Sequence, residues 1–133
     1  MKNHLFLYGT LLTGASDEVA NIVRQFRRVG EAYVRGKLYD LGEYPGAVAD
    51  PSSNTSIRGE LVELPPDQEL LEELDRYEEF YPSSPEASLF VRKRTRVKTA
   101  DGRDHEAWIY IYNKDPGDAP IVRGGDYSKS RVA

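Results

Sequence analysis

Two stretches of this chain alternate aromatic or branched residues with polar residues, which is the two-residue period of a β-strand with one buried face. They run from Ala32 to Leu41 and from Ser56 to Leu64, and each contains one internal glycine, Gly36 or Gly59. Glycine inside a strand permits a tight bend or the close approach of another backbone. We therefore predict two strands that belong to a curved sheet.

Three further runs have the composition of strands. Leu5 to Tyr8 is a short apolar run that stops at Gly9, as expected for a buried strand that enters a tight turn. Leu89 to Lys98 and Glu106 to Tyr112 flank the turn sequence Asp101-Gly102, so we expect them to pair as a hairpin. Together with the two glycine-bearing strands, this hairpin would suit a sheet that curls toward a small barrel.

Two helices are predicted between these strands. Ser16 can cap the first helix, whose apolar residues recur at the spacing of one helical face, at Val19, Ile22, Val23 and Phe26. The second helix is expected from Asp67 to about Phe80, after two prolines that are tolerated at a helix start. Between the two glycine-bearing strands, the turn-rich segment from Gly42 to Ala47 is predicted to be an ordered loop.

The order of these elements predicts an α+β fold, with a small mixed, barrel-like sheet and two main helices. A chain of 133 residues fits a single domain over residues 1–133. The net charge of -4 gives no general attraction to nucleic acid or to anionic membranes, so neither is expected as a partner. No cysteine is present, which excludes disulfides and thiolate chemistry, and a cytoplasmic location is the expectation.

One carboxylate of the second helix lies where apolar residues are expected. At about 100° per residue, Leu70, Leu71, Leu74 and Tyr77 fall within an arc of about 120°, and Glu78 projects into the same arc. A buried carboxylate without a partner costs several kcal/mol or shifts its pKa upward. Glu78 is therefore a structural charge with a partner, a residue that reaches solvent near the helix end, or a catalytic acid-base.

A second candidate feature is the sequence Tyr8-Gly9-Thr10-Leu11, at the end of the first strand. A strand that ends in Gly-Thr can turn backbone N–H groups toward a cavity, where they can bind a carboxylate or a developing oxyanion. The alternative is a plain turn at the end of a strand. The pairing of this loop with Glu78 is what favours a small-molecule site.

Several motifs, in order and spacing, make the chain similar to the gamma-glutamylcyclotransferase-like (AIG2-like) family. They are Tyr8 to Leu11, Gly42 to Gly46, Leu74 to Glu78, Phe90 to Arg92 and the closing Gly125 to Tyr127. The resemblance implies a cofactor-free enzyme that cyclises a gamma-glutamyl group to 5-oxoproline and releases an amine or amino acid. It also implies that Glu78 is the general acid-base and that Tyr8, Gly9, Thr10 and Leu11 bind the glutamyl group.

Two more residues are candidate substrate contacts. Tyr44 lies in the turn-rich segment, and Arg92 could pair with the substrate carboxylate or with Glu78. Arg92, Arg94 and Arg96 also share one strand face, so a solvated basic stripe is the alternative for Arg92. Departures from the family pattern, such as Phe90 where many relatives have tyrosine, leave the attached amine open.

Other functions fit the sequence less well. The basic residues near Arg92 beside Tyr110 and Tyr112 could bind single-stranded nucleic acid, but the overall acidity argues against it. Only His4 and His105 are available, and neither stands in a metal-ligand or Ser-His-Asp arrangement, so no metal is expected. The main alternative to an enzyme is a non-catalytic small-molecule-binding or regulatory protein on the same fold. The oligomeric state is left open.

Overall fold

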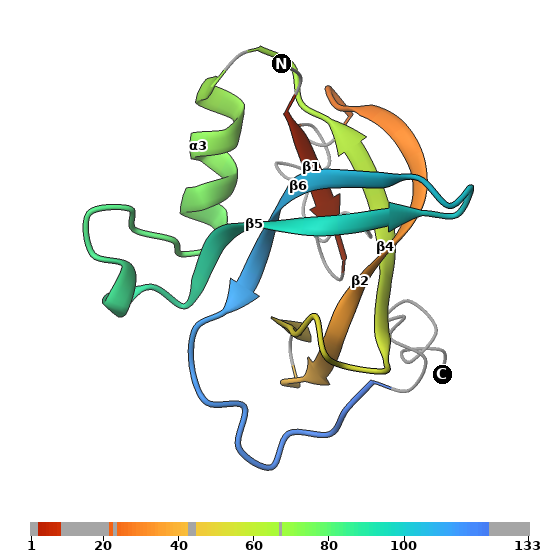
Figure 1. Ribbon diagram of the computed structural model, residues 1–133. Helices are drawn as coiled ribbons and strands as arrows, with labels where there is room; N and C mark the ends of the chain where they lie inside the picture. The colour runs from red at the N-terminus through yellow and green to blue at the C-terminus, as the bar shows by residue number, and fades with distance from the viewer. Residues whose placement is uncertain (1–2, 9–21, 23, 43–44, 67, 123–133) are drawn as a thin grey trace.

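A curved sheet that closes on itself dominates the fold (Figure 1). The computed structural model describes residues 3–8, 22, 24–42, 45–66 and 68–122. The elements in these ranges are β1 (His4–Leu7), β2 (Arg27–Asp40), β3 (Pro45–Ala49), β4 (Ser56–Glu63), α3 (Gln68–Tyr77), the 3-10 helix η1 (Pro85–Ala87), β5 (Phe90–Thr99) and β6 (Asp104–Tyr112). Neighbouring strands follow the order β3-β2-β4-β1-β6-β5, and an additional pairing of β2 with β5 closes a barrel.

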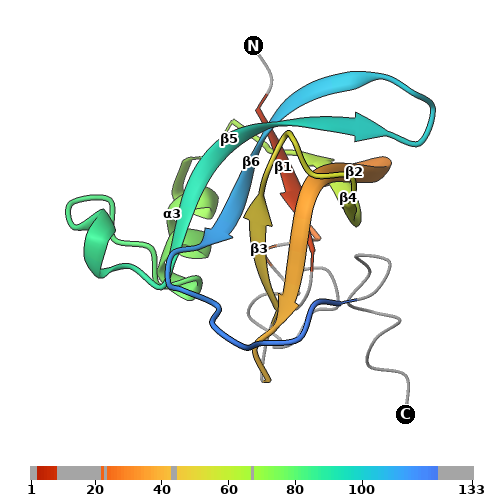
Figure 2. The ribbon, with the colours of Figure 1, turned by 60° about the horizontal axis from the view of Figure 1, so that its bottom comes forward.

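The long strand β2 makes this closure possible. It pairs with β4 from Arg27 to Arg35, with β5 at Ala32 and Tyr33, and with β3 from Gly36 to Asp40. The turned view shows β3 beside the second half of β2, below the β5–β6 hairpin (Figure 2). The pairing of β1 with β6 is parallel, whereas the other pairings are antiparallel. The predicted α+β fold with a mixed, barrel-like sheet is confirmed.

Two glycines permit the close strand contacts that the sequence indicated. A Cβ atom on Gly59 would overlap the carbonyl oxygen of Leu7 in β1, and a Cβ on Gly36 would overlap that of Val48 in β3. Any larger residue would therefore force these strands apart. The curvature of the sheet depends on glycine at both positions.

One predicted segment is wrong. The turn-rich stretch from Gly42 to Ala47 was expected to be a loop, but Pro45 to Ala47 belongs to β3. Within the described residues, β3 pairs with β2 alone, so it is an edge strand that tolerates a proline at its first position. The second helix is shorter than predicted, and most of the first lies outside the described residues; Ile22 and Phe26 are both buried, as its predicted apolar face requires.

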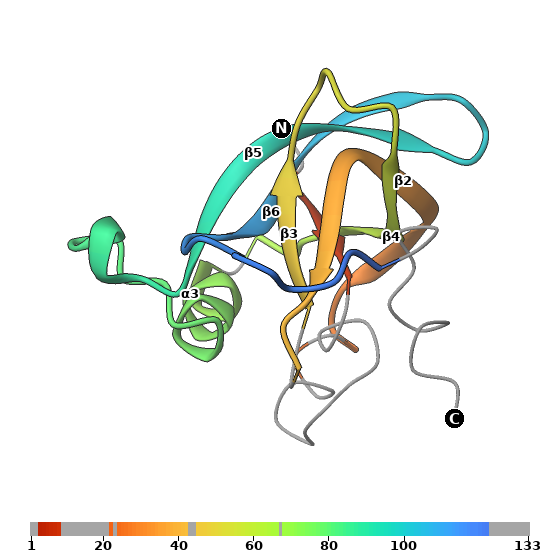
Figure 3. The ribbon, with the colours of Figure 1, turned by 90° about the horizontal axis from the view of Figure 1, so that it is seen from below.

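The buried apolar residues form two clusters, one inside the barrel and one between the sheet and α3. Alternate residues of β1 point to opposite faces, so that Phe6 lies in the barrel interior while Leu5 and Leu7 lie in the cluster that contains Leu70 and Leu74 of α3. Seen from below, α3 lies outside the ring of strands, beside β5 and β6 (Figure 3). No helix among the described residues is long and apolar enough to cross a membrane.

Candidate functional site

Glu78 lies at the C-terminal end of α3. Its backbone N–H donates to the carbonyl of Leu74 at 2.9 Å, which is the last α-helical bond. Glu79 then adopts a left-handed conformation with φ of 55°, and the N–H groups of Glu79 and Phe80 donate back to Arg76 and Asp75 at 3.2 and 2.8 Å. This pair of bonds is a Schellman motif, which fixes the direction of the chain at Glu78.

The environment of Glu78 favours its protonated form. Burial, and secondarily the negative charge of Glu79, raise the pKa of Glu78 from 4.5 to about 7. The negative end of the helix dipole acts in the same direction, because carbonyl oxygens gather at a helix C-terminus. In the described part of the chain, no hydrogen bond or ion pair to another residue engages its partly exposed carboxylate. The described residues thus supply no partner that would make Glu78 a paired structural charge.

One helical turn earlier, Asp75 is held in a buried network. The residue is 4% exposed, and its two carboxylate oxygens accept hydrogen bonds from Nε and Nη2 of Arg92 at 2.8 and 3.1 Å. The hydroxyl of Tyr110 donates to the same carboxylate at 2.8 Å. Bidentate, charge-assisted bonds of this kind restrict geometry more than a single contact does. The network therefore connects the end of α3 to β5 and β6.

Aromatic rings cover the guanidinium of Arg92. Its Cζ atom lies 4.4 Å from the centre of the Trp108 ring and 5.8 Å from that of Phe80. The Cζ atom of Arg94 lies 5.0 Å from the centre of the same Trp108 ring. Stacking on an aromatic face favours a cation, particularly where water is excluded. Arg92 is thus half-buried and bound to Asp75, whereas Arg94 and Arg96 are exposed.

Tyr8 connects β1 to the same region. Its buried hydroxyl donates to the carbonyl oxygen of Tyr110 and accepts the N–H of Ala47 at 3.3 Å. Burial, and then the charge of Glu78, raise the pKa of Tyr8 well above its ordinary value. The charge of Glu78 also contributes to the raised pKa of Tyr110, behind burial and Asp75. The charge of Glu78 therefore acts on both buried hydroxyl groups.

The candidate residues are therefore only partly brought together in the described chain. The charge of Glu78 acts on the hydroxyl of Tyr8, and Arg92 is linked to the end of α3 through Asp75. Gly9, Thr10, Leu11 and Tyr44 lie outside the described residues. Their predicted contacts with a substrate remain predictions.

The sequence pattern missed Asp75 as part of the site. In helical projection Asp75 lies about 40° beyond Leu71, at the border of the apolar arc, so a second carboxylate flanked the buried face. That signal could have indicated burial. It could not have indicated Arg92, which is 17 residues away on another element, or Tyr110, which is 35 residues away.

The arrangement can move protons more readily than it can hold a metal. Within the described ranges, no three His, Asp or Glu side chains converge as metal ligands. A carboxyl with a pKa of about 7 can accept and return a proton near neutral pH. Fold and site together define a small α+β barrel protein with a candidate acid-base carboxyl at a helix end.

Comparisons with known proteins agree with this class. The model of the family described as "Gamma-glutamyl cyclotransferase, AIG2-like" matches residues 5–129. A protein of Vibrio cholerae named "Putative gamma-glutamylcyclotransferase" is 30% identical over 127 residues, which is 96% of this chain and 96% of that protein. The chain therefore belongs to the gamma-glutamyl cyclotransferase, AIG2-like family.

Solved structures share the fold. An AIG2-like protein of Mus musculus superposes with a TM-score of 0.73 at 21% identity, over 95% of this chain and 88% of that one. YkqA of Bacillus subtilis gives a TM-score of 0.71 at 23% identity, over 97% of this chain but 40% of its own length. The present chain thus spans less than half of YkqA. At these identities the likeness establishes the fold alone.

Proposed function

We propose that this protein is a gamma-glutamylcyclotransferase that uses Glu78 as its general acid-base. In this reaction the α-amine of a gamma-glutamyl amide attacks its own gamma-carbonyl, the five-membered ring of 5-oxoproline forms, and the bond to the departing amine breaks. The observation that carries the proposal is the position of Glu78, at a fixed helix end with a pKa of about 7. Membership in the family supports the choice of reaction.

The raised pKa suits both proton transfers. The attacking amine must first lose a proton from its ammonium form, which is a weaker acid than any carboxyl group. Transfer to a carboxylate of pKa about 7 costs roughly 3.4 kcal/mol less than transfer to a carboxylate of pKa 4.5. The protonated Glu78 would then donate to the departing nitrogen.

The remaining catalysis would come from positioning. An intramolecular attack needs no external nucleophile, and holding the amine against the carbonyl can supply about 7 kcal/mol or more. We expect backbone N–H groups in the segment from Tyr8 to Leu11 to bind the substrate carboxylate or the oxyanion. Tyr8 would form a wall of this site with a neutral hydroxyl, because its raised pKa disfavours the phenolate.

Arg92 would have two roles, one toward Asp75 and one toward the substrate. Two of the five N–H donors of Arg92 bind Asp75, and this pairing holds the helix turn that leads to Glu78. The other donors could contact the substrate carboxylate, as the sequence predicts. Tyr44 is proposed as a further wall of the glutamyl site.

The direct test is release of 5-oxoproline from a panel of gamma-glutamyl amines and amino acids. Wild-type protein should be compared with Glu78→Gln and with Glu79→Gln, a matched control that removes the neighbouring carboxylate. We expect Glu78→Gln to lower kcat by about 10² to 10⁴-fold, while Glu79→Gln keeps most of the activity. Equal activity in wild type and Glu78→Gln would refute the assignment of the base.

A complete lack of release from the whole panel would have a different meaning. If gamma-glutamyl compounds still bound, for example in calorimetric titrations, the protein would be a binding or regulatory member of the same fold. The proposed reaction would then be rejected.

A further inference from the structure

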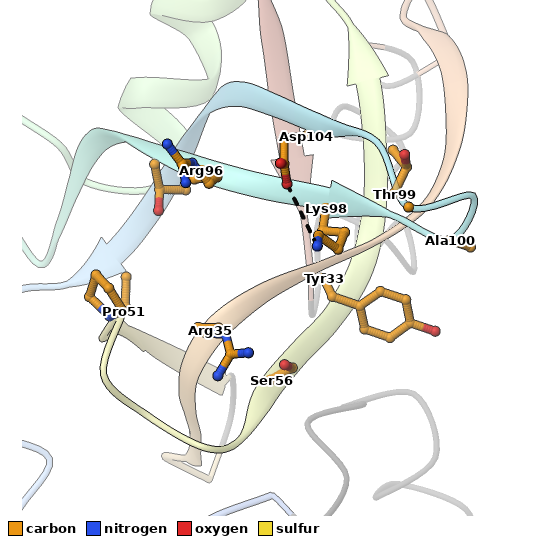
Figure 4. Close-up of a pocket in the computed structure, with 12 residues that line it drawn as sticks. Tyr33, Arg35, Pro51, Ser56, Arg96, Lys98, Thr99, Ala100 and Asp104 are labelled. Atoms are coloured by element: carbon orange, nitrogen blue, oxygen red, sulfur yellow. Dashed lines mark ion pairs between the residues drawn. The ribbon is translucent and has the colours of Figure 1, made fainter.

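A pocket opens at the seam where the barrel closes. β2 and β5 pair over two positions, Ala32 with Thr99 and Tyr33 with Lys98, and then separate. The pocket between them has a volume of about 630 Å³. Its polar and charged lining comes from β2, β4, β5 and the start of β6 and includes Arg35, Ser56, Thr95, Arg96, Lys98 and Asp104. Figure 4 shows Arg96 and Lys98 on β5, across the gap from Arg35 and Ser56.

This seam pocket is separate from the site around Glu78. None of its lining residues belongs to the group formed by Tyr8, Asp75, Glu78, Arg92 and Tyr110. The lining reaches the tip of the β5–β6 hairpin at Ala100 and Gly102, and Figures 1 and 2 show this tip on the side of the barrel away from α3.

The lining has a positive charge in a protein whose net charge is -4. It contains three cations, Arg35, Arg96 and Lys98, against one carboxylate, Asp104, which lies 4.0 Å from Lys98. Glu106 is opposite Arg96 in the strand register, but its carboxylate lies 4.0 Å from Arg94. A concave surface with unbalanced cations attracts anions more strongly than scattered surface lysines do.

One of the cations is held in place by an ordered turn. Nη1 of Arg35 donates to the carbonyl oxygen of Ser53 at 3.0 Å, and its other N–H donors make no hydrogen bond to the residues that the structure describes. The turn itself is fixed, because the hydroxyls of Ser53 and Thr55 lie 2.8 Å apart and Thr55 donates to the carbonyl of Gly36 at 2.8 Å. A guanidinium that is already restricted loses less conformational entropy when a ligand binds, so binding costs less free energy.

We propose that the seam pocket binds the phosphoryl group of a small phosphorylated molecule. A guanidinium fork and a lysine ammonium are the side chains that recognise phosphate oxygens, and the hydroxyls of Ser56 and Thr95 add neutral donors. The volume lies in the range of small-molecule pockets and exceeds the space that one phosphoryl group needs. The remaining space would hold the organic part of the ligand.

The proposal can be tested by NMR titration of ¹⁵N-labelled protein at constant ionic strength. The probes are inorganic phosphate, which presents the group alone, and phenyl phosphate, which adds an organic part. We expect saturable shifts at the amides of Arg35, Ser56 and residues 95–100, with tighter binding of phenyl phosphate. Shifts that never saturate, or that spread evenly over exposed lysines and arginines, would overturn the proposal.

Variants separate this site from general electrostatics. Arg35→Gln and Lys98→Gln should each weaken binding of phenyl phosphate by about tenfold. Lys93→Gln, which removes an exposed cation of the same strand outside the lining, should leave it unchanged. Equal weakening by all three variants would reject a specific site. Glu78→Gln should bind like wild type, so the outcome is independent of the proposed cyclotransferase activity.

Discussion

Arg92 and Asp75 form a bidentate ion pair between β5 and α3, with distances of 2.8 and 3.1 Å, one helical turn before Glu78. The side chains are 17% and 6% exposed, so both charges have lost most of their water. Breaking such a pair leaves one charge buried without a partner, which costs more than the pair itself contributes. The end of α3 is therefore positioned by an interaction that is sensitive to single substitutions.

A double-mutant cycle should reveal this coupling. We expect Asp75→Asn and Arg92→Met each to lower the free energy of unfolding by about 3 kcal/mol, because each leaves the other charge buried without its opposite charge. The double variant should be more stable than the sum predicts, by at least about 1 kcal/mol. Urea unfolding measures all four proteins.

An exposed ion pair supplies the control for this cycle. Arg28 and Glu60 lie 2.9 Å apart with side chains 62% and 32% exposed, so Arg28→Met should cost less than about 1 kcal/mol. Additive losses at Asp75 and Arg92 would mean that the two residues stabilise the protein independently.

The pH dependence of the reaction should report Glu78. The base must be ionised in the free enzyme, so kcat/KM for 5-oxoproline release should fall below an apparent pKa of about 7. Glu79 is the second cause of the raised pKa, and Glu79→Gln should therefore move this limb to lower pH. A limb that stays in place in Glu79→Gln, or one near pH 4.5 in wild type, would contradict this prediction.

The free energy of unfolding should also depend on pH through the carboxyl group of Glu78. The pKa of Glu78 is higher in the folded protein than its ordinary value of 4.5, so the folded state binds more protons and loses stability as pH rises from about 4.5 to about 7. Glu78→Gln removes this penalty. Because the side chain is partly exposed, we expect a gain on the order of 2 kcal/mol above pH 8 and almost none below pH 4.

Urea unfolding of wild type and Glu78→Gln at several pH values between 4 and 9 would test this. The difference between the two proteins should grow with pH. A difference that stays constant, or that shrinks as pH rises, would show that burial does not raise the pKa of Glu78.

The strands could be predicted from sequence because their signal is local. Two-residue alternation located β2 and β4, and the glycines Gly36 and Gly59 indicated the close contacts that curve the sheet. The same local reasoning failed at Pro45 to Ala47, where turn-forming residues concealed β3. That strand exists because it pairs with the second half of β2, a contact that no local pattern contains.

For the candidate site, local patterns likewise reach only part of the arrangement. Helical periodicity placed Glu78 among apolar residues, and the structure buries it enough to raise its pKa. The pairing of Asp75 with Arg92 depends on how α3 packs against β5, and three arginines alternate along that strand. Nothing in the spacing of Arg92, Arg94 and Arg96 indicates which one meets Asp75.

The left-handed residue that follows Glu78 allows a last prediction. Glu79 has φ of 55° in the Schellman motif, a position where glycine is the usual residue because it has no Cβ to clash. Glu79→Gly and Glu79→Gln remove the same charge, but only glycine removes the backbone strain. In urea unfolding, we expect the free energy of unfolding of Glu79→Gly to exceed that of Glu79→Gln by about 1 kcal/mol. Both variants should shift the acidic limb of the kcat/KM profile equally. Lower stability of Glu79→Gly would mean that the helix end is not strained and that contacts of the longer side chain hold it.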